Sequence, residues 1–148
     1  MKSDNRLWRT LHVLLHMNES QAPMTSQAIG EMLNTNAVVV RRTMAGLRER
    51  HYVVSEKGHG GGWRLNCRLD EMTLFDVYEA LGQPAIFALG EPQDSQGCLV
   101  EQAVNDALGE VLTQAKNLLL ERFKAIKISQ IEQDFEGLKK RLGVDVLS

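Results

Sequence analysis

The sequence predicts a mainly α-helical protein with a small β-hairpin wing, namely a winged helix-turn-helix DNA-binding domain plus a long dimerisation helix. Three observations predict this fold class. Residues 25–50 have the pattern of two short helices joined by a tight turn. Residues 52–65 contain two β-prone runs on either side of a glycine-rich tip. Residues 98–126 carry a helical apolar stripe that is too long for so small a domain to cover.

The paired helices are indicated by their caps and by the spacing of apolar residues. Thr25 can accept a hydrogen bond from a free backbone N–H at the start of the first helix, and residues 34–36 supply the turn and a cap for the second. The expected buried residues of the first helix lie on one face: Ala28, Ile29, Met32 and Leu33. The second helix, from about Asn36 to Arg50, buries Val40, Met44 and Leu47. Its other faces show small and basic residues, which suits the major groove of DNA.

Three stretches carry a resemblance to a known family. They are VRR-x4-L in the second helix, VVSEKGHGGGWRL in the wing, and MTLFDVYEALG in the helix that follows. Together they resemble the Rrf-two family of bacterial winged-helix transcription regulators, from Arg6 to about Leu142. That family includes the iron–sulfur cluster regulator, the nitric-oxide-sensing repressor and the cysteine-metabolism repressor. Because the family usually has glycine at the position of His51, we expect the helix to end differently here.

Nine residues are candidates for contacts with double-stranded DNA. Arg41 and Arg42 are expected to read base edges, since arginine pairs with guanine O6 and N7. Phosphate contacts are expected from the helix starts and from the end of the second helix: Thr25, Ser26, Thr35, Asn36 and Arg48. Lys57 and His59 would act from the wing. The alternative for all nine is a solvated basic face.

The charge distribution agrees with a DNA-binding front half. The net charge of the chain is −2, but residues 1–70 hold 10 Lys/Arg against 6 Asp/Glu, and residues 71–148 hold 7 against 13. The first half therefore carries +4 and the second −6, which favours a DNA-binding module joined to a part that does not touch phosphate. No run approaches the ~20 apolar residues of a membrane span, so we expect a cytoplasmic protein with no membrane partner.

The remaining chain predicts a helix before the paired helices and three after the wing. The first is expected from Ser3 or Asp4 to about Met17, with buried Leu7, Trp8, Leu11, Leu14 and Leu15. A capping box at Thr73 and Asp76 opens a helix that stops at Gly82. Ser129 and Glu132 are expected to cap a last helix that ends at Gly143 and buries Ile131, Phe135, Leu138 and Leu142. We place domain boundaries at 1–82, 83–97 (a linker or effector loop, with Ile86, Phe87 and Leu89 packed down) and 98–148.

Few residues are candidates for metal binding or for redox chemistry. Relatives that hold an iron–sulfur cluster use three cysteines before the long helix, and here only Cys98 matches, because Cys67 lies beside the wing. A cluster needs about four ligands, so we expect no cofactor. Cys98 is a candidate redox sensor at a helix start, with a structural cysteine as the alternative. His12 and His16 have a permissible ligand spacing, but no third ligand is near, so we predict rim histidines and no metal site.

The leading hypothesis is a homodimeric repressor that binds a palindromic operator and responds to a redox or small-molecule effector. No motif of nucleophile and base is present, so we predict no enzyme. One alternative is a redox sensor with a cluster completed across the dimer. The other is a winged-helix module for protein association that has lost DNA binding.

Overall fold

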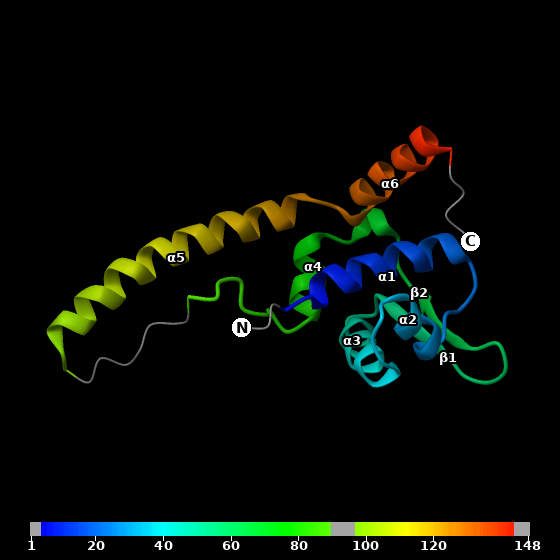
Figure 1. The fold of residues 1–148 in the computed structure, drawn as a ribbon, viewed down its shortest axis with the longest axis horizontal. Helices are drawn as coiled ribbons and strands as arrows, with labels where there is room; N and C mark the ends of the chain where they lie inside the picture. Colours follow the sequence, from blue (N-terminus) through cyan, green and yellow to red (C-terminus); the bar gives the residue numbers. More distant parts are fainter. Residues whose placement is uncertain (1–3, 90–96, 144–148) are drawn as a thin grey trace.

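The structure, a computed structural model, describes residues 4–89 and 97–143 and confirms a mainly α-helical fold with one hairpin (Figure 1). Its elements follow in chain order: α1 (Arg6–Ser20), α2 (Ser26–Met32), α3 (Ala37–Glu49), β1 (Val53–Glu56), β2 (Gly62–Leu65), the 3-10 turn η1 (Leu69–Glu71), α4 (Leu74–Ala80), α5 (Leu99–Ala125) and α6 (Ile128–Leu142). We call residues 4–82 the winged-helix body. Among the described helices none is long and apolar enough to cross a bilayer.

The core of the body forms where α1, α3, α4 and the hairpin meet. Its most deeply buried side chains come from every one of these elements: Val13, Leu14, Met44, Leu47, Val53, Met72 and Val77. Helix α3 approaches α4 so closely that a Cβ on Gly46 would lie 2.5 Å from the carbonyl oxygen of Ala80. The expected apolar face of α3 is therefore confirmed, and its opposite face is left for other contacts.

Helices α2 and α3 begin at the predicted caps. Thr25 Oγ1 accepts from the backbone N–H of Ala28 at 3.0 Å, and Asn36 Oδ1 accepts from that of Val39 at 3.0 Å. Ile29 is buried, but Ala28 is exposed, so its predicted burial is wrong. His51 adopts φ 64° at the end of α3, the left-handed conformation of the family's glycine. The expectation of a different helix end is wrong, since histidine takes that conformation here.

The hairpin is antiparallel, with Val53 opposite Leu65 and Glu56 opposite Gly62. Its second strand also pairs with the segment before α2: Met24 and Trp63 exchange backbone hydrogen bonds of 2.9 and 2.8 Å. A Cβ on Gly62 would lie 2.7 Å from the carbonyl carbon and oxygen of Met24. Glycine is required at this position because the two backbones approach so closely.

Helix α5 extends away from the body (Figure 1) and buries none of its 27 residues. Six of its large apolar side chains are 49–78% exposed: Leu99, Val100, Val104, Leu108, Val111 and Leu118. Only its C-terminal end meets α4, where the Tyr78 and Phe123 rings lie 6.1 Å apart and Lys124 Nζ lies 4.6 Å from the Phe75 ring centroid. The predicted apolar stripe is thus present, and no element of the described ranges covers it.

The segment between α5 and α6 returns the chain to the body. The N–H of Leu74 donates to Ile126 O at 3.0 Å, and the N–H of Ile128 donates to Met72 O at 2.8 Å, so residues 126–128 pair with 72–74. Ile128 is fully buried in the core. Helix α6 then lies beside α1 (Figure 1), where Asn18 donates to Glu132 at 2.6 Å and Lys139 pairs with Glu19 at 3.1 Å.

Several predicted details of the remaining helices need correction. Helix α1 runs three residues beyond Met17, and its N-cap is Asn5, so the predicted cap at Asp4 is wrong, although Asp4 Oδ1 accepts from the N–H of Arg6 at 3.0 Å; Ser3 lies outside the described residues. Ser129 does not cap α6, because the helix already begins at Ile128, and the N–H of Lys127 donates to Gln130 Oε1 at 2.7 Å. Four side chains expected to be buried are exposed: Trp8 (75%), Leu89 (81%), Leu138 (46%) and Leu142 (71%). No other element of the described chain covers them, which the apolar pattern alone does not reveal. The capping box of Thr73 and Asp76 and the helix end at Gly143 are confirmed.

Candidate nucleic-acid interface

The start of each paired helix presents a polar side chain that keeps a donor free. Thr25 and Asn36 use an oxygen as the cap acceptor, so the threonine hydroxyl proton and the asparagine NH₂ group remain available. Both residues are exposed. A Cβ on Gly30 would lie 2.9 Å from the carbonyl oxygen of Thr35, so glycine permits the tight approach of the turn to α2. These donors suit phosphate oxygens.

Arg41 and Arg42 are exposed on α3, on the surface not used by its buried residues. Arg48 is exposed near the C-terminal end of α3, and Lys57 is exposed at the wing. None of these four cations has a carboxylate partner within the described ranges. By contrast, four arginines at other positions of the body are paired at 2.6–2.9 Å: Arg6 with Asp4, Arg50 with Glu79, Arg64 with Glu56 and Arg68 with Asp70. Positive charge is therefore left uncompensated along α3 and at the wing.

Trp63 joins the wing to both paired helices. Its indole Nε1 donates to Ser26 Oγ at 2.9 Å, and the guanidinium carbon of Arg48 lies 5.7 Å from its ring centroid. Ser26 accepts in this bond and keeps its own hydroxyl proton to donate. Ser26 and Arg48, which the sequence places 22 positions apart, are thus brought to one junction at the base of the wing.

The small residues of the wing tip allow a sugar–phosphate backbone to approach it closely. Gly58 and Gly60 have φ of 95° and 79°, and a Cβ on Gly61 would lie 2.3 Å from the carbonyl oxygen of Glu56. Lys57 and His59 are both exposed in this tip. A tip of small residues flanked by a cation fits against a sugar–phosphate chain.

Two features of this surface were missed from the sequence. Arg64 crosses the hairpin to Glu56 at 2.9 Å and also donates to Gln21 O at 3.2 Å, which ties the wing to the end of α1. Val38 on α3 is 58% exposed and offers an apolar contact. Its position off the buried stripe of Val40, Met44 and Leu47 was a usable signal. Thr35, conversely, is half-buried and faces inward.

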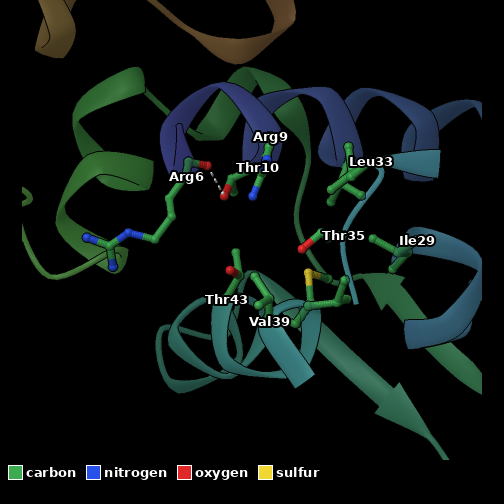
Figure 2. Close-up of a pocket in the computed structure, with 11 residues that line it drawn as sticks. Arg6, Arg9, Thr10, Ile29, Leu33, Thr35, Val39 and Thr43 are labelled. Atoms are coloured by element: carbon green, nitrogen blue, oxygen red, sulfur yellow. Dashed lines mark hydrogen bonds between the residues drawn. The ribbon is translucent and has the colours of Figure 1, made fainter. Parts of the chain in front are cut away.

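Thr35 lines a small pocket between α1, α2 and α3 (Figure 2). The pocket has a volume of about 20 Å³, and its walls include Arg9, Ile29, Leu33 and Val39. A water needs about 10–15 Å³, whereas a typical ligand site has roughly 300 Å³ or more. The pocket therefore admits a water molecule but no organic effector.

The cysteines differ in their surroundings. Cys98 is the exposed residue before α5, and its side chain makes no capping bond. Cys67 is half-buried and donates weakly to Tyr52 O at 3.6 Å; burial, assisted by Glu71 and Asp76, raises the pKa of its thiol to about 11. No group of three or more His, Cys, Asp or Glu side chains that can hold a metal occurs in the described ranges. One exposed thiol per subunit does not fit the ligand set of an iron–sulfur cluster.

Comparisons with known proteins place this geometry in a family. A protein from Lactobacillus plantarum assigned as a transcriptional regulator is 18% identical, with a TM-score of 0.75 over 94% of this chain and 95% of that one. IscR from T. potens is 16% identical, with a TM-score of 0.68 over 94% and 91%. CymR, the global cysteine regulator of B. subtilis, is 17% identical, with a TM-score of 0.56 over 88% and 95%.

At these identities the three structures show the same fold. No curated protein sequence matches the chain significantly. The model of the Rrf2 family, described as iron-dependent transcriptional regulators, matches residues 4–134, from the first described residue into α6. The resemblance seen in the second helix, the wing and the following helix is thereby confirmed. The chain belongs to the Rrf2 family of transcriptional regulators.

Proposed function

We propose that the protein is a homodimeric repressor that binds a palindromic operator through α3 and the wing, without catalysing a reaction. The observation that carries this proposal is the set of cations on α3 and the wing that have no carboxylate partner in the described residues. Four of the other arginines of the body, Arg6, Arg50, Arg64 and Arg68, are neutralised by short ion pairs. Uncompensated positive charge beside free hydroxyl and amide donors is the kind of surface that binds a nucleic acid.

The residue roles follow from position. Arg41 and Arg42 are suited to guanine O6 and N7 in the major groove, with Val38 beside them for a thymine methyl group. Phosphate contacts are assigned to Thr25, Ser26, Asn36 and Arg48, and the wing contributes Lys57 and His59. Thr35 is given no phosphate contact here, because it lines the inner pocket and its backbone N–H donates to Gly30 O at 2.8 Å.

The dimer is proposed because α5 carries its apolar seam uncovered. A helix of 27 residues is about 40 Å long. The same helix of a second copy, related by a two-fold axis, would cover both seams at once. Two copies of α3 would then face two half-sites of a palindrome, separated by about one or two turns of DNA.

We further propose that the repressor works without a resident iron–sulfur cluster, because only one exposed thiol per subunit is available. A thiol switch at Cys98 is the second candidate function. Its exposure at the start of the proposed dimer helix favours it over a purely structural cysteine.

The test is binding of the purified protein to fragments of its own upstream region at several salt concentrations. Arg41→Ala should lower specific affinity by roughly 10–100-fold and change non-specific binding little. Arg48→Ala should weaken both and reduce the salt slope by about one. Arg68→Ala, which removes an arginine already paired with Asp70, is the matched control and should change neither.

Two outcomes would contradict the proposal. Equal loss of specific and non-specific binding in Arg41→Ala would make Arg41 a phosphate contact. Absence of salt-dependent binding to every fragment would favour a protein-association module. Oxidant added to wild type and to Cys98→Ser separates the thiol switch, because only a sensor loses its response in the variant.

A further inference from the structure

A pair of histidines on α1 lies outside the DNA-binding surface. His12 and His16 are one helical turn apart, and a hydrogen bond of 3.1 Å joins their Nε2 atoms, with ring centroids at 4.8 Å. A tetrahedral ion with Zn–N bonds of about 2.0–2.1 Å holds two ring nitrogens roughly 3.3 Å apart. The two imidazoles are therefore already spaced, within a few tenths of an ångström, as two ligands of one ion.

The space beside the pair has room for the other ligands of an ion. His12, Leu15, His16 and Glu19 on α1, together with Phe135 on α6, enclose a pocket of about 220 Å³. Glu19 follows the pair on the same helical face, but its carboxylate is held by Lys139 at 3.1 Å. Lys139 in turn pairs with Glu136 at 2.7 Å and lies 4.7 Å from the Phe135 ring centroid. The protein thus offers two nitrogen ligands, and water can fill the remaining positions.

We propose that His12 and His16 form a binding site for a divalent transition-metal ion of the zinc class, with two protein ligands and two exchangeable positions that face the α1–α6 pocket. Imidazole is a preferred ligand of Zn²⁺, and two neutral nitrogens favour it over Mg²⁺ or Ca²⁺, which take oxygen ligands. The ion would join successive turns of α1 next to Asn18 and Glu19, the residues that bond this helix to α6.

The test is calorimetric titration of ZnCl₂ into the full chain, without a histidine tag and in a Cys98→Ser background that removes the exposed thiol. We expect His12→Gln and His16→Gln each to raise the Kd for Zn²⁺ by at least about tenfold. His51→Asn is the matched control, because asparagine also accepts the left-handed backbone at this position, and it should leave the Kd unchanged.

A second readout does not depend on the heat of binding. Zn²⁺ should raise the thermal unfolding midpoint of the parent and of His51→Asn, but not of the His12 and His16 variants, since only a bound ion stabilises the folded state. Co²⁺ should give a visible absorption band that either variant abolishes. The proposal is overturned if the parent binds no Zn²⁺ up to about 1 mM, or if binding survives unchanged in His12→Gln or His16→Gln. Circular dichroism of each variant shows whether it is folded.

Discussion

The winged-helix body and helix α5 use apolar residues in opposite ways. The body buries residues from each of its helices in one continuous core, with Leu14, Leu47 and Val77 fully enclosed. Helix α5 is almost twice as long as any other helix of the described chain and buries none of its residues. Apolar spacing at helical period predicts both elements equally well, yet only in the body does the chain cover its own apolar face. The difference separates the part that stabilises the folded body from the part that we propose to serve association.

The largest expected effect concerns the core of the body. Leu47→Ala should lower the free energy of unfolding by about 2–5 kcal/mol, because the side chain is fully buried and leaves a cavity. Leu118→Ala on α5 should cost far less in the isolated subunit, where that side chain is 63% exposed. Urea unfolding at dilutions that favour the monomer measures both. An equal loss of unfolding free energy in the two variants would show that α5 is covered within the subunit.

The next effect concerns association. Val111→Asp places a carboxylate in the exposed seam and should weaken the proposed dimer by about 3 kcal/mol, roughly 100-fold in Kd. Thr113→Asp, two positions along the helix and on another face, is the control with the same charge. Sedimentation velocity over a concentration series reads the dissociation directly. An unchanged dimer in Val111→Asp would move the interface away from α5.

The smallest effect compares the two thiols. At pH 8, Cys67 should react with iodoacetamide at least about tenfold more slowly than Cys98, because a thiol with a pKa of about 11 is almost entirely protonated there. Its rate should rise as the pH approaches that pKa, since burial disfavours the thiolate. Mass spectrometry of each cysteine peptide gives the rates, and in urea the two should converge. Fast reaction of native Cys67 would show that the body opens readily beside the wing.

The sequence predicted those features of the fold and candidate site that depend on neighbouring residues. Thr25, Asn36 and Thr73 cap their helices as expected, because a cap needs only residues two or three positions away. The exposed arginines of α3 follow in the same way from the position of its buried stripe. Caps and helical faces are local properties and can be read from spacing.

The wrong predictions depend on contacts between distant residues. Ser129 does not cap α6, because residues 126–128 pair with residues 72–74 and the helix therefore begins earlier. This pairing joins residues more than fifty positions apart in the sequence. Trp8 and Leu142 have apolar side chains on faces that no described element covers. The bond from Trp63 to Ser26 and the pocket beside His12 and His16 likewise require elements that only the folded chain brings together.

The anchoring of Trp63 has a mechanical consequence. A two-stranded hairpin alone is barely stable in water, but backbone bonds join this one to Met24, the Trp63 indole donates to Ser26 of α2, and its ring contacts Arg48 of α3. These contacts hold the wing in a defined position relative to α3. In the proposed dimer, a signal that releases DNA would leave the wing and α3 of each subunit in place relative to each other. It would instead change the distance between the two copies of α3. Such a change would act through the short pairing of residues 126–128 with 72–74, where the chain after α5 returns to the winged-helix body.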